Sequence, residues 1–218
     1  MREATRATAA LRADGHDVGV AVNLSVRNLF DTELLGELER ALGDAGLDPR
    51  HLVVELTESE IMDDPSVALA QFRASQALGV GTSVDDFGTG YSSLTYIRDL
   101  PLTELKVDRS FVADLHQRGG AYTIVRSMID LGHNLGLEVV AKGVEHPDDT
   151  STLVRLGCDR AQGYAIARPM PEADLARWLD AHARGERTRC GGRQPAGVRL
   201  ILTLRRRPTA HRQRSGCA

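Results

Sequence analysis

Two adjacent carboxylates, Asp85 and Asp86, form the pair in this sequence best suited to chemistry. They follow the short, β-branched segment 80–84, which predicts a buried strand, and they precede Gly88 and Gly90, which permit a tight and mobile loop. Two acids at a strand end, followed by a glycine hinge, suit a divalent-cation site beneath a lid. A solvated acidic turn is the alternative interpretation of the pair.

Further polar side chains fall near the ends of other predicted strands. They supply amide, carboxylate and ammonium groups and are Asn23, Glu55, Lys106, Lys142 and Gln162. Glu55 lies in an apolar run, where a carboxylate needs a partner or a metal to be tolerated. One such residue could be a core polar group whose hydrogen bonds are satisfied. A whole set at equivalent places instead indicates a shared pocket.

These residues need a fold in which strands and helices alternate. The hydrophobic patterns predict strands over 18–24, 52–58, 80–84, 104–108, 137–144 and 160–164. They predict helices over 1–11, 30–45, 65–78, 94–100, 121–135, 147–156 and 172–183. Short loops between alternating elements favour a parallel α/β fold. In a barrel of the triosephosphate-isomerase kind, the carboxyl ends of the strands hold the active site.

Composition excludes several classes of protein. The chain has 218 residues, enough for one domain with a sizeable core, and its net charge of -3 does not indicate a nucleic-acid binder. No apolar run approaches the roughly 20 residues that cross a bilayer, and no secretory signal is present, so we expect a cytoplasmic protein. The three cysteines, Cys158, Cys190 and Cys217, form no C-x-x-C pair, which argues against a disulfide framework or a zinc site.

The character of the chain changes after residue 184. Residues 185–218 contain many arginines, interspersed with Gly, Pro and Thr, and Glu186 is their single acid. Such a tail can bind nucleic acid or a membrane surface, but it lacks the interleaved aromatic residues that stack on bases. We therefore divide the chain into a domain at 1–184 and a basic, disordered tail at 185–218.

The ordered motifs of the first segment resemble those of the EAL domain, a bacterial family of cyclic di-GMP phosphodiesterases with a (β/α)8-type barrel. The resemblance rests on VAVNLS at 20–25, ELTES at 55–59, DDFGTGYSSL at 85–94, LKVDRSF at 105–111, GVE at 143–145, LGCD at 156–159 and QGY at 162–164. It extends over about residues 1–179. It implies cyclic di-GMP as the ligand and pGpG as the hydrolysis product.

The resemblance also implies roles for individual residues. Asn23, Glu55 and Asp85 correspond to metal ligands, and Asp86 corresponds to a ligand of a second metal, which fits the preference of Mg²⁺ or Mn²⁺ for oxygen. Two such metals lower the pKa of a water and neutralise the phosphodiester. The catalytic roles fall to Lys106, beside the attacking water, and to Glu145, while Gln162 closes the pocket.

Two more implications concern a loop and a partner. Glu58 steadies the loop that begins at Asp86 and contains Phe87, Gly88, Thr89 and Gly90. The apolar helix at 121–135 is a candidate homodimer surface by the same resemblance, but its apolar face favours packing against the barrel core.

The sequence departs from the family pattern in two ways. The Glu-Ala-Leu signature, with the first two strands, would have to precede Met1, so we expect an incomplete (β/α)8 barrel whose flanking strands have unpaired edges or pair with another copy. Lys142 stands where the family carries a metal-binding glutamate, which places an ammonium in the site.

We hypothesise that the ammonium of Lys142 takes the place of a metal and neutralises Glu55, Asp85 or Asp86. Three functions remain open on the sequence alone: a phosphodiesterase, a non-catalytic cyclic di-GMP-binding signalling module, and a non-functional gene fragment.

Overall fold

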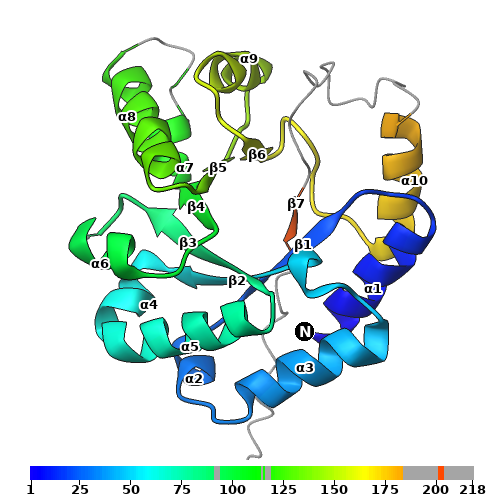
Figure 1. Cartoon of the computed structure of the whole chain (residues 1–218). Coiled ribbons are helices and arrows are strands. Elements are labelled where there is room, and N and C mark those ends of the chain that lie inside the picture. The colour runs from blue at the N-terminus through cyan, green and yellow to red at the C-terminus, as the bar shows by residue number, and fades with distance from the viewer. Residues whose placement is uncertain (91–93, 114, 116–118, 184–200, 204–218) are drawn as a thin grey trace, which may run out of the picture.

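The computed structural model describes residues 1–90, 94–113, 115, 119–183 and 201–203. Strands and helices alternate through most of this part of the chain, as the hydrophobic pattern predicts (Figure 1). The strands are β1 (Gly19–Asn23), β2 (Leu52–Thr57), β3 (Gly81–Phe87), β4 (Glu104–Val107), β5 (Glu138–Lys142), β6 (Arg160–Gln162) and β7 (Ile201–Thr203).

These strands form one sheet in the order β6-β5-β4-β3-β2-β1-β7, and all neighbouring strands are parallel. Consecutive strands from β1 to β6 lie side by side, each joined to the next through a helical crossover. The predicted α/β class and incomplete barrel are confirmed, because β1 to β6 and their helices build an open half-barrel. All carboxyl ends of these strands therefore meet at one edge.

The helices surround the strands in Figure 1. The longer ones are α1 (Arg2–Ala13), α3 (Leu34–Ala45), α5 (Pro65–Ala77), α8 (Gly120–Asn134), α9 (Pro147–Arg155) and α10 (Glu172–Ala183). Shorter ones directly follow β1 to β4 and are α2 (Val26–Leu29), α4 (Glu58–Asp63), α6 (Leu94–Asp99) and α7 (Arg109–Val112). None of the described helices is long and apolar enough to span a membrane.

The helix predicted over 30–45 begins later than expected, at Leu34. The preceding segment forms the separate helix α2, whose N-terminus is fixed by Ser25: its backbone N and its Oγ both donate to Asn28 Oδ1, at 3.0 and 2.8 Å. Helix α2 ends at Leu29, and the following residue, Phe30, is exposed. A local capping interaction thus overrides the hydrophobic pattern.

The apolar face of α8 packs in the core. Val125 and Ile129 are fully buried and belong to the main hydrophobic cluster, whereas Ile124 is exposed. The core interpretation of this face is therefore confirmed. The homodimer remains a prediction.

Strand β7 was not expected. The sequence predicts a disordered tail over 185–218, yet Ile201, Leu202 and Thr203 pair with Gly19, Val20 and Ala21 of β1. An open edge offers unpaired N–H and C=O groups that an apolar segment can join. The prediction of an unpaired edge at β1 is therefore wrong, and the prediction for the rest of the tail lies outside the described residues.

Candidate functional site

A cavity of about 810 Å³ opens at the carboxyl ends of the strands. All seven polar residues predicted from the strand ends line it, namely Asn23, Glu55, Asp85, Asp86, Lys106, Lys142 and Gln162. The parallel register explains this convergence, because Asn23 lies beside Glu55 and Lys142 lies beside Gln162. The shared pocket inferred from the sequence is therefore present in the fold.

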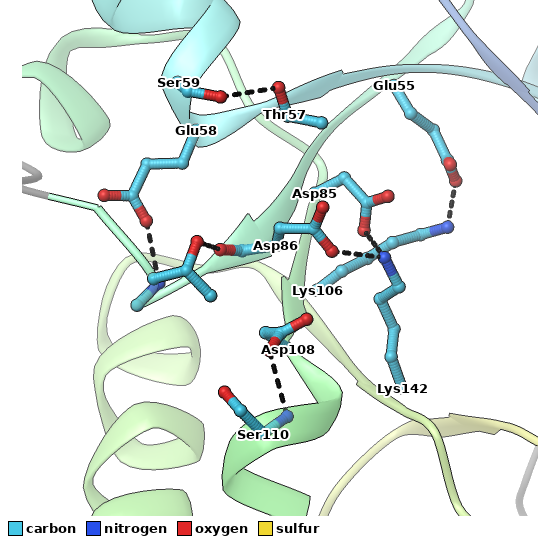
Figure 2. Close-up of polar contacts among 12 residues, drawn as sticks. Glu55, Thr57, Glu58, Ser59, Asp85, Asp86, Lys106, Asp108, Ser110 and Lys142 are labelled. Atoms are coloured by element: carbon cyan, nitrogen blue, oxygen red, sulfur yellow. Dashed lines mark hydrogen bonds and ion pairs between the residues drawn. The ribbon is translucent and has the colours of Figure 1, made fainter.

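The ammonium of Lys142 lies between two carboxylates (Figure 2). Its Nζ donates to Asp85 Oδ1 at 2.6 Å and to Asp86 Oδ1 at 2.7 Å. Burial alone would lower the pKa of Lys142, but the hydrogen bonds to the two aspartates outweigh it and raise the pKa above its ordinary value. Lys142 is therefore a cation at neutral pH, and both aspartates have a charged partner.

A second ammonium, that of Lys106, pairs with Glu55 Oε1. Both side chains are completely buried, 1% and 0% exposed, so each charge depends on the other. Burial raises the pKa of Glu55, and the adjacent Lys106 opposes that shift. The requirement that Glu55 have a partner is confirmed, and the partner is a lysine. Of the three acids that Lys142 was expected to neutralise, it therefore contacts two.

The loop after β3 is held by Glu58. Its Oε2 accepts a hydrogen bond from the backbone N of Gly88 at 2.7 Å, and Thr89 Oγ1 donates to the carbonyl of Asp86 at 2.8 Å. Phe87 is buried at the end of β3. The role predicted for Glu58, steadying this loop, agrees with these contacts.

The two glycines of the loop are required for different reasons. Gly88 has φ +97°, and a Cβ there would meet Met128 and Phe111 side chains at 2.6 and 2.8 Å. A Cβ on Gly90 would lie 2.6 Å from Glu58 Oε1, the carboxylate that holds the loop. Larger residues would thus move either the loop or Glu58.

Several lining residues were not predicted. They come from α1, from the segment after β1 and from α3, and are Met1, Glu3, Ser25, Asn28 and Glu37. Ser25 and Asn28 could have been found because they directly follow the end of β1. Glu3 and Glu37 carry no such signal, since only the packing of α1 against α3 brings them to the cavity.

Glu145, predicted to be catalytic, has a different placement. It follows β5, is exposed, and is absent from the cavity lining. The neighbouring Lys142 and Gln162, by contrast, both line the cavity. The structure thus brings together the predicted metal-site and pocket residues but leaves Glu145 apart from them.

This arrangement does not fit the divalent-metal centre implied by the resemblance. Asp85 and Asp86 each direct an oxygen at Lys142, and Glu55 directs one at Lys106. Within the described ranges, no group of three or more His, Cys, Asp or Glu side chains is placed to hold a metal ion. The ligand oxygens are present, but ammonium groups already bind them.

Comparison with known proteins gives a consistent result. The family model described as EAL domain matches residues 1–169. The bifunctional diguanylate cyclase/cyclic di-GMP phosphodiesterase MucR of Pseudomonas aeruginosa is 43% identical over 162 residues, which are 74% of this chain and 24% of MucR. The cyclic di-GMP phosphodiesterase NbdA of the same organism is 40% identical over 183 residues, 84% of this chain and 23% of NbdA. The chain spans about a quarter of the length of these relatives.

Two solved structures share the architecture. The PaMucR phosphodiesterase in its c-di-GMP complex superposes with a TM-score of 0.75 at 42% identity, covering 80% of this chain and 71% of that one. The EAL domain of Mycobacterium smegmatis DcpA superposes with a TM-score of 0.76 at 34% identity, covering 82% and 81% of the two chains.

Proposed function

The chain belongs to the EAL domain family, and from this membership we propose that its cavity binds cyclic di-GMP and hydrolyses it to pGpG slowly or not at all. The relatives MucR and NbdA are named as cyclic di-GMP phosphodiesterases, and the PaMucR structure is a complex with c-di-GMP. The proposed reaction class is phosphodiester hydrolysis, weakened in this copy.

The cavity has the size of a small-molecule site. Its volume of about 810 Å³ falls in the range usual for small-molecule sites, roughly 300–1,000 Å³. Lys106 and Lys142 offset part of the negative charge of the carboxylates that line the cavity. The amides of Asn23 and Gln162 can both donate and accept hydrogen bonds. These groups support recognition of a cyclic dinucleotide.

The position of Lys142 is the observation that carries the impaired activity. Divalent metals in such a reaction activate a water and neutralise the phosphodiester. An ammonium bonded to Asp85 and Asp86 supplies positive charge, but it is a far weaker activator of water than a metal. Ligand binding is therefore retained in this proposal while hydrolysis is lost.

The finer assignments form part of the same proposal. Lys106 lies beside the attacking water, and Glu145 would have to reach the ligand from the exposed segment after β5. Mg²⁺ or Mn²⁺ is the metal expected of the family. A cytoplasmic location and a homodimer through α8 remain predictions.

The test is a calorimetric titration of the purified chain with cyclic di-GMP, in EDTA and in excess Mg²⁺ or Mn²⁺, with each mixture then separated by chromatography. We expect binding and little or no pGpG. The EAL segment of MucR, assayed in parallel, is the positive control. Product formed as fast as by MucR would refute the impaired activity, whereas no binding in any condition would favour a non-functional gene fragment.

A further inference from the structure

The only two lysines of the chain, Lys106 and Lys142, both line the cavity. The chain has 27 lysine and arginine residues, and all the others are arginines. A lysine ammonium is a compact point charge with three donors, whereas a guanidinium is a planar fork. Of the two basic residue types, the cavity therefore uses lysine, whose ammonium resembles a bound cation in size and charge more closely than a guanidinium does.

Lys142 reaches across the sheet to its partners. It ends β5, while Asp85 and Asp86 lie on β3, and β4 runs between these two strands. The ammonium thus bridges strands that share no backbone hydrogen bonds. A cation coordinated by acids from separate strands would make the same kind of connection.

The backbone at Asp86 is shaped for this contact. Successive side chains of a strand point to opposite faces, so Asp85 and Asp86 would normally diverge. Asp86 instead has φ +54°, the only positive φ of a non-glycine residue in the described part of the chain. Figure 2 shows both carboxylates directed at the Lys142 ammonium. This backbone conformation costs energy in an L-residue, and the shared cation offsets that cost.

Asp86 also connects the cation to the loop. Its carbonyl accepts from both Oγ1 and backbone N of Thr89, at 2.8 and 3.3 Å. Two residues after Asp86, the backbone N of Gly88 donates to Glu58. The contact between Lys142 and Asp86 therefore acts on the same few residues that Glu58 holds.

We propose that Lys142 is an internal cation that excludes divalent metals from Asp85 and Asp86 and itself fixes the loop over 87–90 for ligand binding. This inference deepens the proposed function and rests on it only for the identity of the ligand. Replacing Lys142 with glutamate converts the same site into a metal site, because it removes the ammonium and adds a carboxylate.

The first experiment uses Mn²⁺ alone, without nucleotide. Titration calorimetry compares the wild-type chain with the variants Lys142→Glu and Lys142→Met, and with Arg98→Met, which alters an exposed ion pair on α6. We expect wild type and Arg98→Met to bind Mn²⁺ at least about tenfold more weakly than Lys142→Glu does. The Mn²⁺ affinity of Lys142→Met, which frees the aspartates without adding a ligand, should lie between those of wild type and Lys142→Glu. Equal Mn²⁺ affinity in wild type and Lys142→Glu would overturn the proposal.

A second measurement needs no mutation and so does not depend on the variants folding. Lysine-selective ¹⁵N labelling of the wild-type chain labels only Lys106 and Lys142, and paramagnetic Mn²⁺ broadens the resonances of nuclei near it. We expect both lysine signals to persist at stoichiometric Mn²⁺. Loss of the Lys142 signal at that concentration would show that the metal enters the site beside the ammonium, contrary to the proposal.

Cyclic di-GMP then tests the link to ligand binding. Wild type should bind it equally, within about twofold, in EDTA and in Mg²⁺, whereas Lys142→Glu should require the metal. The same metal requirement in wild type would overturn the internal-cation role. No heat from any variant would refute the proposed ligand but leave the Mn²⁺ result intact, so the two failures are distinguishable.

Discussion

Two clusters of charged side chains lie on the inner face of the half-barrel, one at each end of its strands. The carboxyl-end cluster contains Lys142, Asp85, Asp86, Lys106 and Glu55. The amino-end cluster contains Arg160, Glu104, Glu138 and Ser83. Residues two apart on a strand share a face, so β4 supplies Glu104 to one cluster and Lys106 to the other.

The amino-end cluster is built around the guanidinium of Arg160, which is 16% exposed, and its outer partner Glu138 is 48% exposed. Arg160 Nη1 donates to Glu104 Oε2 at 2.8 Å, its Nη2 pairs with Glu138, and Ser83 Oγ donates to Glu104 Oε1 at 3.0 Å. Glu104 is only 2% exposed. A planar guanidinium, permanently charged and bound to two carboxylates, links β4, β5 and β6 as a fixed brace.

The carboxyl-end cluster is open on one side. Lys142 and Asp86 are 16% and 41% exposed and face the cavity. A single ammonium there holds its partners by charge rather than by a matched planar geometry. Similar ion pairs thus brace the strands at one end of the half-barrel and line the cavity at the other.

The largest effect should come from Arg160→Met. Removing the guanidinium takes from the buried Glu104 the cation with which it pairs, which should lower the unfolding free energy by about 3–5 kcal/mol. Urea denaturation measures this change, and Mg²⁺ should not restore the loss. Arg98→Met, at an exposed ion pair, is the control that should leave stability unchanged. A similarly small effect of Arg160→Met would show that the amino-end cluster is no brace.

Lys142→Met should have a smaller and reversible effect. Asp85 and Asp86 are less deeply buried than Glu104, so we expect a loss of about 1–3 kcal/mol. Mg²⁺ should restore part of the stability, because the freed aspartates can bind it. Thermal unfolding with and without Mg²⁺ distinguishes the clusters. If Mg²⁺ acted equally on Arg160→Met, the comparison between them would fail.

Gly90→Ala should perturb only the carboxyl end. The added Cβ would displace the Glu58 carboxylate and break its hydrogen bond with Gly88, for a loss of about 1 kcal/mol. Cyclic di-GMP affinity, measured by calorimetry, should fall as well. The matched control is Gly43→Ala in α3, where a Cβ meets nothing within 4 Å. This substitution should raise the unfolding free energy by about 0.5–1 kcal/mol. Unchanged ligand affinity in Gly90→Ala would separate the loop from binding.

The smallest expected effect is a dependence of the unfolding free energy on pH. Burial raises the pKa of Glu104 above 4.5, against the opposing influence of Lys106, Arg160 and Ser83. The folded chain then binds this proton more tightly than the unfolded chain, so stability falls as pH rises from 4.5 through the folded pKa. One proton limits this slope to about 1.4 kcal/mol per pH unit. The variant Glu104→Gln should lack this pH dependence of stability. If urea denaturation gave it a pH profile parallel to that of wild type, the assignment to Glu104 would be contradicted.

The sequence predicted the cavity better than the contacts inside it. Strand ends could be located from β-branched runs, and parallel strands must bring their carboxyl ends together, so all seven polar residues predicted from the strand ends line the cavity. That Lys142 binds Asp85 and Asp86 rather than Glu55 could not be inferred. The choice depends on Lys106 having taken Glu55 and on the backbone turn at Asp86.

Three other features of the structure could not be predicted from local sequence patterns. Arg160 and Glu104 lie far apart in the sequence and meet across β5. The distance between their side chains depends on the curvature of the sheet. Strand β7 depends on an edge that exists only once β1 has joined the sheet. Glu145 matched a motif, but a motif does not determine on which side of the strand end a side chain emerges.

The restriction of lysine to the cavity has a consequence for proteolysis of the chain. A protease that cleaves only after lysine has two sites in the whole sequence, and their side chains are engaged with Glu55 and with Asp85 and Asp86. Cleavage requires local opening of the chain around these residues. The rate of lysine-specific proteolysis therefore reports how often the cavity comes apart, and a tightly bound ligand should slow it.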